Sequence, residues 1–252
     1  MKNLNDYWTK RISGKKVLVT GGTTGIGREV VILLVALGAR CMICGRNQPQ
    51  IDETITAAIA QGGSGSCEGL VADLADADDI INLFETTDRQ LGGIDILINN
   101  AALGYGSVTE GSYQDWDYII RTNLTAYLAC AHQAIKRMEA AGSGHIINIG
   151  SMSADVREVG SSVYVATKSA IQGFSETLRK EVNCKGIKVT LIEPGAVDTD
   201  MQPDSGPEKE EQVQNLEMLR TEDIAMAVTF CLAQHERCDV VNMQIRPHLQ
   251  II

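Results

Sequence analysis

The sequence predicts an α/β protein built on one doubly wound parallel sheet, with helices on both faces of that sheet. Short apolar runs, rich in β-branched residues, alternate with longer segments of helical period along the chain. The chain has 252 residues, a length at which an α/β sheet commonly folds as one domain. Right-handed crossovers place helices on both faces of a parallel sheet, so its strands are buried on both faces and are apolar. The expected strands here are short and apolar.

The expected strands and helices follow one another in a β–α rhythm. Strands are expected at residues 16–20, 40–44, 67–71, 94–99, 145–149, 188–192 and 240–244. Helices are expected at residues 25–37, 51–61, 76–91, 113–140, 164–183 and 221–234. Residues 1–13 form an N-terminal extension in this interpretation, and residues 14–252 form the domain.

One segment, residues 198–220, breaks the rhythm. It is rich in Pro, Gly, Glu, Asp and Gln, and it follows a strand end, the place where such sheets bind ligands. We expect it to be a mobile loop or a short helix over a ligand-binding site. A plain surface connector is the alternative.

The composition excludes several classes of partner. The formal net charge is −10, so nucleic acid and anionic membranes, which bind through clustered Lys and Arg, are not expected partners. Residues 1–13 have no apolar segment of signal-peptide kind, and the longest apolar run, residues 30–37, is too short to cross a bilayer. The seven cysteines, an odd number scattered through apolar stretches, indicate buried thiols in a reducing compartment. We therefore expect a cytoplasmic protein.

No metal site is expected. Cys41 and Cys44 have the spacing of a metal-binding or redox pair, but they lie in an expected strand, where cysteine packs as a small apolar residue. The four histidines lie far apart, and no two of them are four residues apart.

A glycine-rich run, Thr-Gly-Gly-Thr-Thr-Gly-Ile-Gly at residues 20–27, follows the first expected strand and opens the first helix. Glycine allows a tight turn and a close approach of backbone to a pyrophosphate, while the helix N-terminus offers free N–H groups to phosphate oxygens. The run is therefore expected to bind a dinucleotide, and a glycine-rich turn without a ligand is the alternative. The residues expected to contact this cofactor are Gly21, Thr23, Gly25, Ile26 and Gly27.

The end of the second expected strand bears on the kind of dinucleotide. An Asp or Glu there usually binds a free ribose 2′-hydroxyl, whereas an Arg accommodates a 2′-phosphate. The residues here are Cys44, Gly45, Arg46 and Asn47, so a carboxylate is missing, and the Arg46 guanidinium can form charge-assisted bonds to a phosphate. NADP(H) is thus favoured over NAD(H). A solvated Arg46 without such a role is the alternative.

Tyr164 and Lys168 lie four residues apart in an expected helix and project from one face. A phenol is a poor acid or base at neutral pH, but a nearby cation stabilises the phenolate and brings its pKa toward the working range. Ser151 follows the strand at residues 145–149, where its hydroxyl can bind a substrate oxygen beside the tyrosine. Asn123 lies in a helical stretch, where an Asn costs stability unless its amide has a partner. Taken singly, the Tyr–Lys pair and Asn123 could also be polar surface residues.

Over residues 14–250 the chain resembles the short-chain dehydrogenase/reductase family, whose members have the Rossmann fold. The resemblance implies that Tyr164 is the proton donor in reduction and that Ser151 orients and polarises the carbonyl. It implies that Lys168 binds the nicotinamide ribose and lowers the tyrosine pKa, and that Asn123 holds a water in the proton relay. The motifs that carry it, in order, are the glycine run, Asn99-Asn100-Ala101-Ala102, Asn123, Ser151, the Tyr164/Lys168 pair and Pro194-Gly195.

The same resemblance implies further cofactor contacts. Asp73 would contact the adenine, and Asn99 would line the cofactor cleft. Ala102 stands where the family usually has Gly, and its methyl group would crowd the cofactor or shift the loop if the backbone there needs a positive φ. Residues 221–225 and 240–250 resemble the branch that contains NADP-dependent 3-hydroxy-acid and serine dehydrogenases. The segment expected to meet the nicotinamide carboxamide contributes Pro194, Gly195, Val197 and Thr199.

These features predict an oxidoreductase that transfers a hydride between NADP(H) and an alcohol/ketone pair. A small polar hydroxy acid or keto compound is expected as the substrate, because Asp155, Arg157 and Glu158 would lack partners beside an apolar steroid or acyl chain. The planar fork of Arg157 could bind a carboxylate. The alternatives are an NAD-preferring sugar or steroid-type alcohol dehydrogenase and a non-catalytic dinucleotide-binding regulator. Apolar faces on the long helices, together with the resemblance, imply a homo-oligomer, either a dimer or a tetramer.

Overall fold

A computed structural model describes residues 4–202 and 204–250 of the chain. Its centre is a seven-stranded sheet in the order β3-β2-β1-β4-β5-β6-β7, in which all six neighbouring pairs are parallel. The predicted fold class is confirmed. The strands are β1 (Lys16–Thr20), β2 (Arg40–Gly45), β3 (Ser66–Val71), β4 (Ile96–Asn99), β5 (Gly144–Ile149), β6 (Ile187–Pro194) and β7 (Asn242–Ile245).

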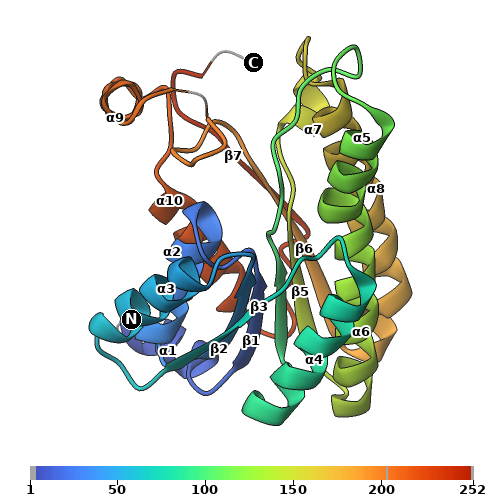
Figure 1. Cartoon of the computed structure of the whole chain (residues 1–252). Coiled ribbons are helices and arrows are strands. Elements are labelled where there is room, and N and C mark those ends of the chain that lie inside the picture. Colours follow the sequence, from blue (N-terminus) through green and yellow to red (C-terminus); the bar gives the residue numbers. More distant parts are fainter. Residues whose placement is uncertain (1–3, 203, 251–252) are drawn as a thin grey trace.

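Helices cover both faces of the sheet (Figure 1). One layer contains α1 (Leu4–Ile12), α2 (Gly25–Ala36), α3 (Gln48–Ala60) and α10 (Thr221–Leu232); the other contains α4 (Ala77–Leu91), α5 (Tyr113–Ile120), α6 (Ala126–Ala141) and α8 (Ser162–Val182). The short helices α7 (Ser153–Val156) and α9 (Gly206–Gln214) lie beyond the carboxyl ends of the strands. Among the described residues, no helix is long and apolar enough to cross a membrane.

Each face of the sheet has its own apolar core. Along β2, Cys41 and Ile43 pack in one core and Met42 and Cys44 in the other. The two cysteines therefore point to opposite faces, because neighbouring side chains of a strand alternate. This confirms that Cys41 and Cys44 are packing residues, and burial raises the pKa of the Cys44 thiol to about 12.

The structure differs from the expected elements in two main places, and at a third it has one of the two forms expected. Residues 1–13 include α1, whose Ile12 is fully buried in the core beside α2, and Arg11 donates a hydrogen bond to the carbonyl of Gln234 at 3.3 Å. The expected helix at residues 113–140 is interrupted by a π-helical segment, η1 (Arg121–Thr125). Within residues 198–220 the structure has α9, the short helix that was one of the two forms expected there.

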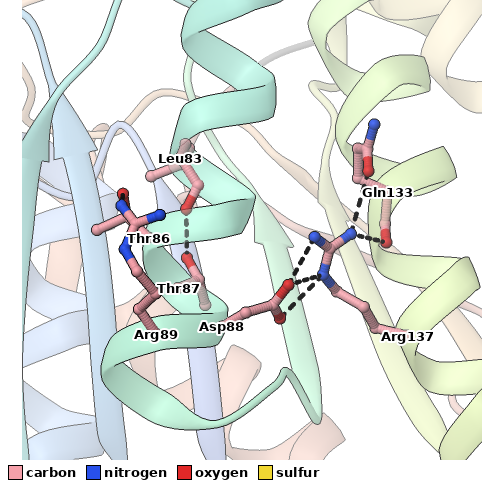
Figure 2. A network of polar contacts seen from close by, with 7 residues as sticks. All are labelled: Leu83, Thr86, Thr87, Asp88, Arg89, Gln133 and Arg137. Atoms are coloured by element: carbon pink, nitrogen blue, oxygen red, sulfur yellow. Dashed lines mark hydrogen bonds and ion pairs between the residues drawn. The ribbon is translucent and has the colours of Figure 1, made fainter.

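A charged network fixes α4 against α6 (Figure 2). The Arg137 guanidinium contacts the Asp88 carboxylate through Nε at 2.9 and 3.0 Å and through Nη2 at 2.7 Å. Its Nη1 donates to Gln133, and its Cζ lies 5.1 Å from the centre of the Phe84 ring. Such a two-point pair is more specific in geometry than a single surface contact. The network thus fixes α6, the helix that continues from η1, against α4.

The strand order reverses between β1 and β4, since β2 and β3 lie on one side of β1 and β4 to β7 on the other. In open α/β sheets, ligands bind at such a switch point, beyond the carboxyl ends of the strands. The glycine run after β1, Ser151 after β5 and Pro194 at the end of β6 all lie at this edge.

Candidate active site

The glycine run forms a tight loop that fits a pyrophosphate. Gly21 and Gly25 have φ values of 61° and 51°, in the left-handed region that favours glycine. A Cβ at Gly27 would lie 2.2 Å from the carbonyl oxygen of Gly21, so no side chain fits there. The N-cap of α2, Thr24, makes no side-chain capping bond, and the first turn of the helix has no acidic residue. The N–H groups at this helix start are therefore available to an anion.

Asn100 and Thr20 brace this loop from the neighbouring strand. The Asn100 amide donates to the carbonyls of Thr20 and Gly21 at 3.1 and 2.9 Å. The Thr20 hydroxyl oxygen accepts from the main-chain N–H groups of Asn100 and Ala101. Sequence reasoning did not give Asn100 a role, because its partners lie 79 and 80 residues away.

Thr23 and Ile26 lie where the loop meets the sheet. The Thr23 side chain fills the space beside Gly45, where a Cβ would come within 2.6 Å of it, and its carbonyl accepts a hydrogen bond from Thr54. Ile26 is half-buried and packs against the core on the α2 face. Thr23 therefore braces the glycine loop against the end of β2, next to Arg46.

Asn99 is directed into the protein and not into the cleft. Its side chain is 1% exposed, and its amide donates to the Tyr127 carbonyl at 3.3 Å and to Asn148 Oδ1 at 3.0 Å. The side chain therefore does not line the cleft: its Nδ2 finds partners on β5 and α6, whereas its buried Oδ1 has none among the described residues. Only the main chain of Asn99 lies at the carboxyl end of β4.

Arg46 and Asp73 are brought together at the ends of β2 and β3, linked by Tyr118 from α5. Arg46 Nη1 donates to the Tyr118 hydroxyl at 3.0 Å, and that hydroxyl donates to Asp73 Oδ2 at 2.9 Å. The other carboxylate oxygen of Asp73 accepts from the Ala75 N–H at 3.0 Å. Nothing in the sequence pattern pointed to Tyr118.

The catalytic candidates Tyr164, Lys168 and Ser151 meet beyond the end of β5. Lys168 is 2% exposed, its Nζ donates to the Ile149 carbonyl at 3.0 Å, and it lies 5.6 Å from the centre of the Tyr164 ring. The Ser151 side chain lies near the Tyr164 phenol, where its hydrogen-bonding hydroxyl opposes the rise in the phenol's pKa. The expected grouping of a phenol, an ammonium and a hydroxyl is thus present.

Burial dominates the titration of this group. It lowers the pKa of Lys168 to about 8. Burial also raises the pKa of Tyr164, while the hydrogen bond with Ser151 opposes that rise. The net effect on the pKa of Tyr164 is therefore a rise, because burial disfavours the charged phenolate. The phenol therefore keeps its proton at neutral pH. The lowering of this pKa by Lys168 stays a prediction.

Asn123 lies in η1, where the main chain widens to π-helical spacing. Its Oδ1 accepts from the Leu103 N–H and its Nδ2 donates to the Leu103 carbonyl, each at 2.8 Å. The expectation that this amide needs a partner is met by the loop after β4. π-helical turns often mark functional positions. Each end of the side chain thus makes one hydrogen bond to the same residue, which ties η1 to the loop after β4.

The segment after β6 crosses the mouth of the site. Pro194 accepts a hydrogen bond from the Met152 N–H at 2.9 Å, and the Gly195 N–H donates to Ile245 at 2.7 Å. Val197 is 4% exposed, so it anchors the segment in the core. A Cβ on Gly25 would lie 3.1 Å from the Thr199 methyl group. The segment therefore packs directly on the start of α2.

The loop after β4 contains Ala102, which stands where the family usually has Gly. Ala102 does not have a positive φ, which among the described non-glycine residues occurs only at Arg157 and Leu216. The backbone therefore does not require glycine there.

The charged residues of the loop after Ser151, namely Asp155, Arg157 and Glu158, are exposed. Asp155 accepts from Gln172 and Gln244, and Glu158 accepts from Ser153 at 2.7 Å. Arg157 uses Nε for the Ala154 carbonyl.

Comparison with known proteins agrees with this geometry. A model of the short chain dehydrogenase family matches residues 15–210. The chain belongs to this family. An uncharacterized oxidoreductase of Staphylococcus aureus strain USA300 is 31% identical over 237 residues, which cover 94% of this chain and 98% of that protein.

Solved structures of this family superpose closely. A short-chain dehydrogenase from Burkholderia cenocepacia J2315 in complex with NADP has a TM-score of 0.83 at 28% identity, over 94% of this chain and 98% of that one. A metagenomic short-chain oxidoreductase in complex with NADP has a TM-score of 0.82 at 26% identity, over 95% of this chain and 100% of that one. The chain is therefore an NAD(P)-dependent short-chain dehydrogenase/reductase that acts on CH–OH groups. Among the described residues, no group of three or more His, Cys, Asp or Glu side chains could hold a metal ion.

Proposed function

We propose that this short-chain dehydrogenase transfers a hydride between NADP(H) and a small polar alcohol/ketone pair. The observation that carries the cofactor preference is the end of β2, where Arg46 stands and residues 44–47 contain no carboxylate. The complexes of two structural neighbours with NADP support it. An NAD-preferring sugar or steroid-type enzyme would need another group to bind a free ribose 2′-hydroxyl at this position.

The residues around Ser151 divide the chemistry of reduction among them. NADPH, when bound, supplies the hydride to the carbonyl carbon. Ser151 donates a hydrogen bond to the carbonyl oxygen, and Tyr164 delivers the proton to that oxygen as it becomes an alkoxide. Lys168 orients the nicotinamide ribose and places a positive charge near the phenolate that forms. Asn123 keeps the loop after β4 in place and holds, through its main chain, the water that returns the proton.

The remaining contacts to the cofactor come from the loops at the switch point. The glycine loop, with Gly21, Gly25 and Gly27, would hold the pyrophosphate, and Asp73 would contact the adenine. The carboxamide would meet the main chain at Pro194 and Gly195, with Val197 and Thr199 behind it. This assignment is supported by the strand ends at which these residues lie.

The substrate we propose is a short hydroxy acid, a β-hydroxy amino acid or a small keto compound. Arg157 lies in the loop that follows Ser151, and within the described part of the chain its two Nη nitrogens make no hydrogen bond. A guanidinium fork can bind a carboxylate at two points. The segment with α9 would close over the ligand and exclude water. Its buried Lys209 donates to the Thr199 carbonyl at 2.8 Å, which ties α9 to the mouth of the site.

The protein is also proposed to be a cytoplasmic homo-oligomer, either a dimer or a tetramer. All seven cysteines are unpaired, as expected of a reducing compartment. The edge strand β7 pairs only with β6 among the described strands. Exposed apolar residues, among them Leu128 on α6 and Phe230 on α10, would be covered by contacts between protomers.

Replacement of Arg46 tests the cofactor preference. With Arg46→Ala we expect kcat/KM for NADPH to fall about 10- to 100-fold, because charge-assisted hydrogen bonds to the 2′-phosphate are lost. The value for NADH should stay unchanged. Steady-state kinetics with both cofactors measure this. Arg40→Ala, at the start of the same strand, is the control and should leave the NADPH/NADH ratio as it is. A wild-type preference for NADH would contradict the proposal.

A further inference from the structure

Tyr118 joins two cofactor-site residues that come from different strands. Arg46 follows β2, Asp73 follows β3, and the Tyr118 hydroxyl lies between them, 3.0 Å from the guanidinium and 2.9 Å from the carboxylate. Its helix, α5, begins at Tyr113 with Ser112 as a capping-box residue, so its start is fixed by hydrogen bonds of its own. The hydroxyl therefore reaches the other two residues from a separately anchored helix.

The direction of each hydrogen bond in this chain is fixed by chemistry. A guanidinium can only donate and a carboxylate can only accept, so the single proton of the phenol points to Asp73 and its oxygen lone pair faces Arg46. Asp73 is itself anchored: Oδ1 accepts from Ala75, and the Asp73 N–H donates to Asp79 at 2.8 Å. Hydrogen bonds in such a chain polarise one another. Arg46 is thus held by a rigid carboxylate through one intervening hydroxyl.

This arrangement affects how freely Arg46 moves. The Arg46 side chain is exposed, and an exposed arginine that binds a ligand loses much rotamer freedom. The bond to Tyr118 removes part of that freedom beforehand. It uses one N–H of Nη1, so the other guanidinium donors are left for a ligand. The hydroxyl also stands between the guanidinium and the Asp73 carboxylate, which would otherwise be a nearby partner for the positive charge.

We propose that Tyr118 is a positioning residue for recognition of the 2′-phosphate of NADP(H). It holds the Arg46 guanidinium ready for the phosphate and keeps it from pairing directly with Asp73. The inference rests on the proposed NADP(H) preference and adds Tyr118 to Arg46 as a second residue behind it. In Tyr118→Phe the ring is retained, and only the hydroxyl that orders Arg46 is lost.

Binding of two nucleotide fragments separates this role from a general packing role. The probes are 2′,5′-ADP and 5′-AMP, which differ only in the 2′-phosphate, and their Kd values are measured by isothermal titration calorimetry. We expect Tyr118→Phe to reduce the preference for 2′,5′-ADP about three- to tenfold, the effect of one net hydrogen bond, and to change the Kd of 5′-AMP by less than this. Tyr113→Phe, on the same helix and 72% exposed, is the matched control and should change neither value.

The same titrations in an Arg46→Ala background test whether Tyr118 acts through Arg46. There Tyr118→Phe should have no further effect on the preference. Equal weakening of both fragments, or an unchanged preference in Tyr118→Phe, would overturn the role of Tyr118 while the NADP(H) preference stands. A wild-type protein that binds both fragments equally well would overturn that preference and this inference together.

Discussion

Tyr164→Phe should lower kcat about 10²- to 10⁴-fold and leave the Kd of NADPH unchanged, because the hydroxyl acts in proton transfer and not in binding the dinucleotide. The phenol lies beside Ser151, and burial raises its pKa, so at neutral pH it carries the proton that reduction requires. Stopped-flow or steady-state reduction of the best ketone measures kcat, and fluorescence titration measures cofactor binding.

Tyr127→Phe is a matched control for the loss of a buried phenol. The Tyr127 hydroxyl donates to the Ile149 carbonyl at 3.1 Å, and this residue is only 1% exposed. We expect this variant to lose about 1 kcal/mol of stability and to keep most of its activity. Should Tyr164→Phe retain about a tenth of the wild-type rate, the acid–base assignment of Tyr164 would have to be abandoned.

Lys168→Met should lower kcat at least about 100-fold. At pH 7 the variant should nevertheless be as stable as the wild type, or more stable. Lys168 is buried, and burial lowers its pKa from 10.5 to about 8, so a buried positive charge is held at a cost at neutral pH. A methionine of similar length removes this cost. The Ile149 carbonyl, which loses the ammonium, still accepts from Tyr127.

The pH dependence of stability distinguishes this explanation from a simple change in packing. Between about pH 8 and 10.5, the unfolded chain keeps a proton on Lys168 that the folded protein releases. The free energy of unfolding of the wild type therefore increases as the pH rises through this window, because the folded protein no longer holds a buried charge. Below about pH 8 Lys168 is protonated in both states, and this pH dependence is absent.

Urea unfolding at pH 7, 8.5 and 10 measures this window. The difference in stability between Lys168→Met and the wild type should shrink as the pH rises. Lys180→Met, at an exposed position of the same helix with a side chain 59% exposed, is the control and should show a difference that does not vary in this way. A difference for Lys168→Met that is constant with pH would contradict a buried, titrating Lys168.

The sheet could be predicted from the sequence because its signal is local. Each strand is a short run between segments of helical period, so all seven expected strands are present, and the β1 boundaries at Lys16 and Thr20 coincide with the expected ones. The glycine run, Ser151 and Pro194 also lie at strand ends, where topology alone brings them to one edge. Tyr164 and Lys168 lie on α8, and their four-residue spacing places them on one face of that helix.

Features that depend on distant partners were not predictable. The π-helical segment around Asn123 is stabilised by a pair of bonds to Leu103, 20 residues away. Tyr118 reaches Arg46 across 72 residues of sequence, and the direction of the Asn99 side chain is set by Tyr127 and Asn148. The raised pKa of Tyr164 likewise reflects burial, which depends on packing of the whole chain and not on the spacing to Lys168.

Transfer of deuterium from NADPH labelled at nicotinamide C4 tests most directly whether this protein is an NADP(H)-dependent reductase of small polar ketones. Purified enzyme would be incubated with labelled NADPH or NADH and with short oxo acids, keto sugars or steroid ketones, and the alcohol products analysed by mass spectrometry. We expect one deuterium on the carbinol carbon, faster from NADPH than from NADH and fastest with the short oxo acids. NADPH binding without transfer to any ketone, or faster transfer from NADH to a sugar or a steroid, would contradict the proposed function.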